Sequence, residues 1–202
     1  MVGCFEPFIS LPHNSFTCDW NGQMTALSMS DFMEMRQDSI PDKPSIFIRG
    51  EDLGRKRIIK NKKDFRLSQV VALRMRNMDG GDTVLDLLSK SSHVSNLEDI
   101  SIVNSGVTDY GMRLLSASTF LTSLTGLDVS FNEISDVGVA YLCASNLVTK
   151  LTYLDLAYNE ISDRGAMLLV EQQKQQHLEQ TNVWGNDVEP ALLSMLDSLH
   201  DD

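Results

Sequence analysis

The chain has 202 residues, of which 42% are hydrophobic and 22% are charged, as in an ordinary soluble globular protein. This composition excludes a collagen-like chain, a disulfide-stapled miniprotein and a globally disordered chain, and no apolar run reaches the roughly 18 residues of a membrane span. The net charge of −11 argues against DNA binding as the main function.

Charge and proline content divide the chain into two parts. Residues 1–90 hold 13 basic and 12 acidic residues, a net charge of +1, whereas residues 91–202 hold 4 basic and 16 acidic residues, a net charge of −12. Four of the five prolines lie in residues 1–44. We therefore expect an N-terminal segment over residues 1–69 and a separate domain over residues 70–202.

The N-terminal segment carries weak patterns. The spacing of Leu27, Phe32 and Met35 predicts a short amphipathic helix over residues 25–36. Ile46 and Ile48 lie 27 residues before Leu73 and Met75, which is the spacing of the repeat described below, so a degenerate edge strand is predicted near residues 45–48. Two interpretations of residues 1–69 stay open: a cap over the end of the repeat domain, which we favour, and a docking segment.

A basic run follows. Seven of the 17 basic residues fall within residues 55–66. We favour a solvated helix face; contact with an acidic partner, an anionic lipid or RNA phosphates, and pairing with the acidic repeats of the same chain, stay open. The candidate anion-binding residues are Arg55, Lys56, Arg57, Lys60, Lys62, Lys63 and Arg66.

A 27-residue repeat begins at residue 70. Each unit follows the pattern L-x-x-L-x-L-x-x-N, whose alternation predicts a strand with one buried face and whose Asn suits the turn after it. A Ser/Thr-Asp pair then predicts a helix start, and a glycine two residues after the Asp allows the helix and the sheet to approach closely. A helix between strands makes successive strands parallel. The units start at Val70, Leu97, Leu124, Leu151 and Leu178.

The unit resembles a known family. LTGLDVSFNEISDVGVAYL (residues 124–142) and LTYLDLAYNEISDRGAMLL (residues 151–169) resemble leucine-rich repeats of the ribonuclease-inhibitor-like subtype. The resemblance covers residues 70–202 and implies a right-handed α/β solenoid with a concave parallel sheet and convex helices. Met78 in the first unit and Thr181 and Pro190 in the last depart from the pattern, as capping units do, and we expect a capping helix at about 189–199.

The concave surface is the candidate binding site. Side chains at the second, fourth, sixth and seventh positions after each unit start are expected to line it. They form a basic end, an acidic middle and an aromatic C-terminal half, and aromatic anchors among charges are typical of protein-binding hot spots. For Phe131 and Tyr158, packing on a neighbouring turn stays an alternative. The candidate partner-binding residues are Arg74, Arg76, Asp99, Asp128, Phe131, Tyr153, Asp155, Tyr158, Asn182 and Trp184.

Catalytic motifs are absent from the sequence. There is no P-loop, G-x-S-x-G, G-x-G-x-x-G, H-E-x-x-H or C-x-x-C motif, so we predict no catalytic residue, no cofactor and no enzyme activity. Cys4, His13 and Cys18 match no zinc-ligand spacing, so no metal site is predicted. Cys143 is expected to be a buried small apolar residue.

The expected function is recognition of a protein partner, whose identity the sequence does not give, by a monomer. The resemblance implies an adaptor, an inhibitor or a delivered bacterial effector. No DNA or membrane partner is expected. We expect no signal peptide and three free thiols, which favours the cytoplasm of the producing cell, or of a host cell for an effector. Two alternatives stay open: the substrate-reading part of a ubiquitin-ligase-type or other enzyme system recruited through residues 1–69, and anionic-lipid or RNA binding through residues 55–66.

Overall fold

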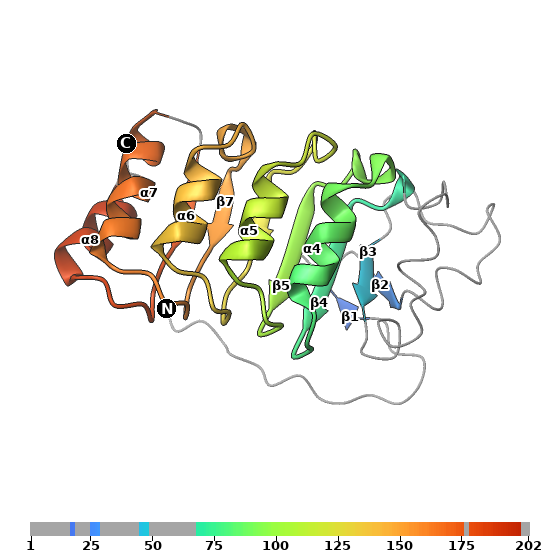
Figure 1. Cartoon of the computed structure of the whole chain (residues 1–202), viewed down its shortest axis with the longest axis horizontal. Helices are drawn as coiled ribbons and strands as arrows, with labels where there is room; N and C mark the ends of the chain where they lie inside the picture. Colours follow the sequence, from blue (N-terminus) through green and yellow to red (C-terminus); the bar gives the residue numbers. More distant parts are fainter. Residues whose placement is uncertain (1–16, 19–24, 29–44, 49–67, 176–177, 199–202) are drawn as a thin grey trace.

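The computed structural model describes residues 17–18, 25–28, 45–48, 68–175 and 178–198. These residues form an α/β solenoid in which helices line one side of a single sheet (Figure 1). The sheet has eight strands in the order of the chain, parallel throughout except that the first pairs antiparallel with the second. The strands are β1 (Thr17–Cys18), β2 (Thr25–Ser28), β3 (Ser45–Ile48), β4 (Ala72–Arg76), β5 (Asp99–Val103), β6 (Gly126–Asp128), β7 (Tyr153–Asp155) and β8 (Gln180–Asn182).

The helices alternate with the strands from β4 onward. The α-helices are α4 (Gly81–Ser89), α5 (Asp109–Ser116), α6 (Asp136–Cys143), α7 (Asp163–Gln175) and α8 (Pro190–Ser198), and two 3-10 turns lie at Ser92–Val94 and Val148–Lys150. The 27-residue period appears directly in the strand register, where Leu73 pairs with Ile100, Leu127 with Leu154, and Leu154 with Thr181. Each repeat therefore stacks on the preceding one without a register shift, as the alignment of the repeats predicted.

The first three strands correct two sequence expectations. β3 occupies residues 45–48 in the register that the 27-residue spacing implies, with Ile46 opposite Leu73, but it is not an edge strand, because β2 pairs along its other side. The helix predicted over residues 25–36 is wrong at Thr25–Ser28, which form β2. Backbone pairing with a neighbouring strand outweighs a weak helical pattern in so short a segment. Residues 29–36 and the basic run at residues 55–66 lie outside the described residues.

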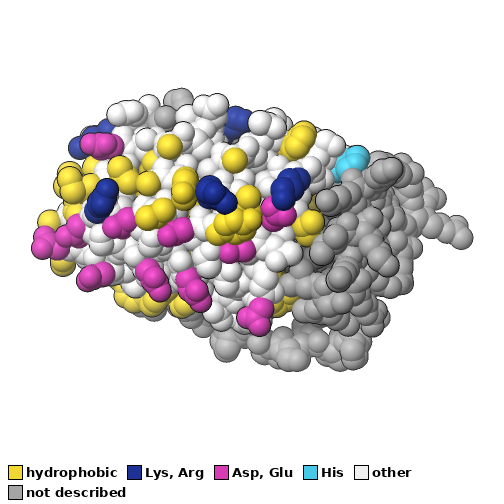
Figure 2. Space-filling model, in the orientation of Figure 1, with side chains coloured by type: hydrophobic (Ala, Val, Ile, Leu, Met, Phe, Trp, Pro, Cys, Tyr) yellow, Lys and Arg dark blue, Asp and Glu magenta, His cyan; other side chains and the backbone are white. Residues whose placement is uncertain are grey.

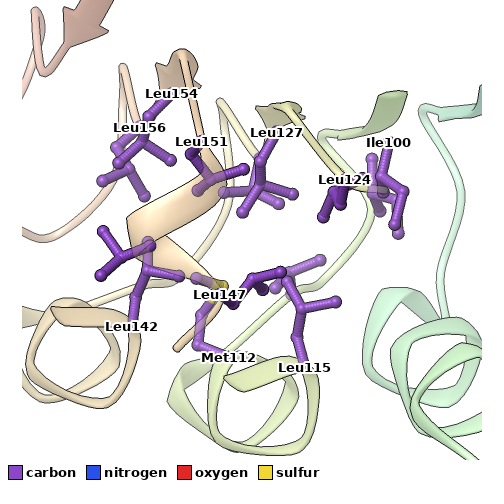
Figure 3. Close-up of a cluster of buried hydrophobic side chains, with 14 of the residues drawn as sticks. Ile100, Met112, Leu115, Leu124, Leu127, Leu142, Leu147, Leu151, Leu154 and Leu156 are labelled. Carbon is purple, nitrogen blue, oxygen red and sulfur yellow. The ribbon is translucent and has the colours of Figure 1, made fainter. Parts of the chain in front are cut away.

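The core lies between the sheet and the helices. The leucine columns of the strands face the apolar side chains of the helices, and Figure 3 shows Leu124 and Leu127 opposite Met112 and Leu115 of α5. Leu154 and Leu156 of the next repeat, and Leu142 of α6, continue the same layer and are fully buried. Full burial of one such side chain stabilises the fold by about 1.5–3 kcal/mol. The core is therefore a continuous stripe that no single repeat closes alone.

The asparagine column satisfies the backbone where the chain leaves each strand. The Asn132 amide nitrogen donates to the carbonyls of Ile102 (2.7 Å) and Val129 (2.9 Å), and its oxygen accepts from the amides of Ser105 and Val107, both at 3.0 Å. Asn159 and Asn186 repeat the pattern in the next two units. The predicted role of this column, in bonding backbone groups at the turn, is confirmed, and each asparagine also joins its repeat to the preceding one.

An aspartate column connects the helix starts of successive repeats. Asp136 accepts hydrogen bonds from the Ser162 amide (2.8 Å), the Ser162 hydroxyl (2.6 Å) and the Gly165 amide (3.0 Å) of the next repeat. Asp109 binds Ser135 and Gly138 in the same way. Burial by itself raises the pKa of Asp136, but the bonds from Ser162 and Gly165 outweigh it and lower that pKa below its usual value.

The glycines two residues after each Asp, called the glycine column below, contact the start of the preceding helix and not, as the sequence predicted, the sheet. A Cβ built on Gly138 would lie 2.5 Å from an Asp109 carboxylate oxygen, and one on Gly165 would lie 2.5 Å from an Asp136 carboxylate oxygen. These glycines therefore allow a close approach between the starts of adjacent helices rather than between helix and sheet. The aspartate column and the glycine column form one joint, because the glycine amide donates to the carboxylate that excludes a side chain there.

Candidate functional site

The open face of the sheet, opposite the helices, carries the candidate site and is called the concave face below. The side chains at the fourth position of each unit alternate with the buried leucines and point to this face. They align across the sheet, with Arg74 opposite Ser101, Asp128 opposite Asp155, and Asp155 opposite Asn182. The structure thus places the predicted basic end on β4 and the predicted acidic middle on β5, β6 and β7.

Within the acidic middle, Asp128 and Asp155 accept side-chain hydrogen bonds from neutral groups of neighbouring residues. Asp128 accepts from the Ser101 hydroxyl at 2.9 Å, and Asp155 accepts from the Asn182 amide group at 3.1 Å and from the Tyr153 hydroxyl at 3.2 Å. Burial raises the pKa of Asp155. The hydrogen bond from the Ala157 backbone amide partly offsets this rise, and the nearby Asp128 carboxylate raises the pKa further. Two carboxylates on adjacent strands thus lie on the same side of the sheet.

Arg74 compensates a different carboxylate. Its guanidinium lies 3.4 Å from Asp99, an ion pair in which both side chains are about one-third exposed. Burial raises the pKa of Asp99, and Arg74 opposes that rise. Surface ion pairs of this kind contribute only about 0–1 kcal/mol to folding. Arg76, the last residue of β4, is exposed.

Tyr153 lies within the acidic middle. The ring is half-buried, and burial together with the charges of Asp155 and Asp128 raises the pKa of its hydroxyl, which therefore stays protonated and donates to Asp155. A groove of about 610 Å³ runs over this part of the face, and its walls include Arg74, Asp99, Asp128 and Tyr153. The groove is an open depression that extends across the sheet from β4 to β7 and is large enough for side chains of a partner.

Three aromatic residues form what we call the aromatic ladder: Phe131, Tyr158 and Trp184. The Phe131 and Tyr158 rings stack with centroids 4.2 Å apart and an interplanar angle of 19°, and Tyr158 meets Trp184 edge to face at 5.0 Å. Phe131 remains 48% exposed, Tyr158 39% and Trp184 61%. The alternative predicted for Phe131 and Tyr158, packing on a neighbouring repeat, is confirmed, whereas partner binding by their exposed faces stays a prediction.

The backbone under the ladder is strained. The seventh position of every unit adopts a left-handed conformation, with φ of +57° at Phe131 and +53° at Tyr158. Other repeats place there Asn77, Asn104 and Gly185, which tolerate this region. A non-glycine residue in this region costs about 1–2 kcal/mol. The chain thus holds two exposed aromatic side chains at positions that folding alone would give to Asn or Gly.

The sixth position of the units contributes less to the surface than predicted. Only Arg76 and Trp184 are exposed in this column, whereas Val103, Ser130 and Ala157 are buried. β6 and β7 end at Asp128 and Asp155, whose carboxylates accept the amides of Ser130 (3.1 Å) and Ala157 (2.9 Å). The chain therefore turns off the sheet before the sixth residue, in an Asx turn that the sequence analysis did not recognise although Asp followed two residues later by Ser or Ala was visible.

The helix side carries a second apolar surface that the sequence analysis did not single out. Tyr110, Val137, Tyr141 and Met167 are large exposed hydrophobic residues on α5, α6 and α7. A hollow of about 550 Å³ lies between α6 and α7, and Figure 2 shows hydrophobic side chains dispersed among charged ones on this side. The apolar positions follow helical spacing and could be found by comparing the outward-facing positions of each unit.

The remaining chemistry of the described residues is sparse. Within residues 68–175 and 178–198, no group of three or more metal-ligating side chains converges on one point. Burial raises the pKa of Cys143 to about 11, so its thiol is protonated at neutral pH. None of the described helices has the length and apolar character required to cross a bilayer. Cys4 and His13 lie outside the described residues.

Comparisons with known proteins agree with the repeat architecture. The family model described as "Leucine Rich repeat" matches residues 120–143 and 149–170. The solved structure of leiomodin-1 actin-binding site 2 is similar with 14% identity, over 75% of this chain and 86% of that one, at a TM-score of 0.54. An internalin from Listeria monocytogenes is similar with 16% identity, over 76% of this chain and 45% of that one, at a TM-score of 0.39. No curated protein matches the chain.

Proposed function

We propose that this chain, a leucine-rich-repeat protein, binds a protein partner on its concave face and uses the aromatic ladder as the anchor of that interface. The aromatic ladder is the observation that carries the proposal. Phe131 and Tyr158 occupy strained backbone positions, and their rings stack on each other yet remain 48% and 39% exposed, so part of each ring stays available to a partner. Exposed aromatic clusters on a rigid surface are typical anchors of protein–protein interfaces.

The polar part of the face supports the same function. Arg74, Asp99 and Asp128 line the groove beside Tyr153, and Asp155 is the partner of Asp128 on the next strand, so both signs of charge lie within one surface. Charged residues around an aromatic centre chiefly set specificity and association rate. Within this proposal the chain acts as an adaptor, an inhibitor or an effector, and the ribonuclease-inhibitor-like subtype and the cytoplasmic location stay predictions.

The alternatives concern other parts of the chain. A ligase-recruiting role for residues 1–69, and lipid or RNA binding through residues 55–66, use residues outside those that the structure describes. The aromatic ladder, beside the concave face, is an exposed stack within the described residues, so the protein-binding proposal has the more specific support. The proposal assigns no reaction to the chain.

The test is a matched capture experiment from a lysate of the source cells. One bait is the wild-type chain, and the second carries Phe131→Asn, Tyr158→Asn and Trp184→Ala. Asn at positions 131 and 158 suits the left-handed backbone, as Asn77 and Asn104 show, so this bait is expected to remain folded. The control bait carries Val137→Asn and Met167→Asn on the helix side, where the side chains are equally exposed.

The readout is the affinity of a purified partner. A protein that the wild-type and control baits capture and the ladder variant does not would be identified, purified and titrated by calorimetry. We expect the ladder variant to lose at least about tenfold in affinity, as substitution of hot-spot residues does. Equal affinity of the ladder variant for every captured protein would overturn the assignment of the concave face.

A further inference from the structure

We propose that the partner presents to this face an extended segment that places an arginine over Asp128 and Asp155 and an apolar side chain on the aromatic ladder. This inference rests on the proposed function and deepens it, because it names the chemistry of the segment that the face recognises. The aromatic ladder marks the docking surface, and the neighbouring charges select its occupant.

The first step is the charge that the face leaves uncompensated. Asp128 and Asp155 are Cα partners on adjacent parallel strands, and such strands lie about 5 Å apart. Among the described residues neither carboxylate has a basic side chain within 4 Å, because Arg74 pairs with Asp99 instead. A partner cation placed between them would relieve the repulsion that contributes to the raised pKa of Asp155.

The second step is the shape of the cation. Two carboxylates on neighbouring strands can each accept a hydrogen bond from one planar guanidinium, which carries five donors in a fixed fork. Tyr153 lies beside the pair, with its hydroxyl 3.2 Å from an Asp155 oxygen, so a guanidinium there also lies next to an aromatic ring. An ammonium ion supplies a point charge without this planar match, so arginine is favoured over lysine.

The third step is the distance to the aromatic ladder. Phe131 and Tyr158 follow Asp128 and Asp155 by three residues in the same repeats, so the Cα atoms of each pair lie at most about 10 Å apart. An extended chain advances about 3.3 Å per residue, so an apolar residue two or three positions from the arginine reaches the ladder. The segment therefore runs from the acidic pair toward the ends of β6 and β7, beyond which the ladder lies.

The experiment uses a phage-displayed library of random linear 12-residue peptides selected on the full chain. Enriched peptides are synthesised and titrated against wild type, the ladder variant and the double variant Asp128→Asn with Asp155→Asn. Asn182 shows that asparagine suits this column, since its side-chain oxygen accepts the Trp184 amide as Asp155 accepts the Ala157 amide. Glu171→Gln, on an exposed position of α7, is the matched loss of charge elsewhere.

We expect enriched peptides to share an arginine two or three residues from an apolar residue. Their affinity should fall at least tenfold on the double Asp→Asn variant and at least threefold when the peptide arginine becomes lysine, and Glu171→Gln should change nothing. Selection of no peptide, of peptides without a basic residue, or of peptides that bind the double variant unchanged would overturn the inference. If those peptides still require the aromatic ladder, the proposed function stands and only the partner chemistry is wrong.

Discussion

At the scale of single residues, the asparagine column shows how one side chain replaces missing backbone pairing. Asn132 is 9% exposed and bonds backbone groups of two successive repeats through both ends of its amide. Its removal leaves buried donors and acceptors without partners, and each unpaired group costs about 1–3 kcal/mol.

Asn132→Ala is therefore expected to lower the free energy of unfolding by at least about 3 kcal/mol. Urea unfolding followed by circular dichroism measures the change. Asn146→Ala, at an exposed position, is the control and should stay within about 0.5 kcal/mol of wild type. A loss below about 1 kcal/mol at Asn132 would contradict the role assigned to this column.

The left-handed backbone at Tyr158 makes a second prediction at this scale. Tyr158→Asn removes the stacking with Phe131 but relieves backbone strain, so the two effects oppose each other. Tyr158→Val loses the same stacking and places a β-branched residue in a region it rarely enters. We expect the Asn variant to be more stable than the Val variant by about 1 kcal/mol or more, measured by urea unfolding. Equal stability of the two variants would argue that this backbone is not strained.

At the scale of elements, the joint between helix starts predicts a pH-dependent stability. Because the folded pKa of Asp136 lies below its unfolded value, the unfolded chain binds more protons as pH falls, and the stabilisation is lost on acidification through the folded pKa. Asp136→Asn should therefore lower stability at pH 7 by about 1–3 kcal/mol, and the difference from wild type should shrink as pH falls through the folded pKa. Denaturant unfolding of both proteins at a series of pH values from 7 downward tests this prediction. A stability difference between them that is constant with pH would exclude ionisation of Asp136 as the cause.

Gly138, at the same joint between helix starts, is a helical position at which we expect alanine to be less stabilising than glycine. Alanine is about 1 kcal/mol better than glycine inside a helix, yet a Cβ at Gly138 would lie 2.5 Å from an Asp109 oxygen and 2.7 Å from Ile134. We expect Gly138→Ala to destabilise the protein by about 1–3 kcal/mol, because overpacking outweighs the propensity gain. Thermal unfolding measures it, with Gly138→Ala in an Asp109→Ala background as the partner variant. If Gly138→Ala destabilises the protein equally in the Asp109→Ala background, the close contact with Asp109 is not the cause of the destabilisation.

At the scale of the whole molecule, the repeats are buried only by their neighbours, so stability should decrease toward the end of the array. Leu154 lies in β7, which pairs with β6 and β8 on its two sides, whereas Leu196 lies in α8, the last of the described helices. Leu154→Ala is expected to cost about 2–5 kcal/mol and to lower amide protection from β5 to β8. Leu196→Ala should affect chiefly α8 and α7. Native-state hydrogen exchange distinguishes these outcomes, and a uniform loss of protection in both variants would indicate a single cooperative unit without an end.

The sequence by itself determined the 27-residue period and the local structure that repeats with it. Five units in phase predicted parallel strands in one register, helices started by Ser or Thr, and asparagines at the turns, because strand alternation, helix capping and amide bonding are local properties that repeat with the residues. The same reasoning placed Arg74, Asp128 and Asp155 on one face, since side chains two residues apart point the same way.

Only the tertiary structure decided which of those side chains meet and which remain exposed. It showed that Asp128 and Asp155 also end their strands, that the glycines face aspartates of the preceding helix, and that Phe131, Tyr158 and Trp184 form one stack. It also placed β2 where a helix was predicted. The glycine contacts, the aromatic ladder and β2 depend on contacts between neighbouring repeats or strands, whose distances and backbone angles a period in the sequence does not specify. The strand ends at Asp128 and Asp155 depend instead on local Asx turns.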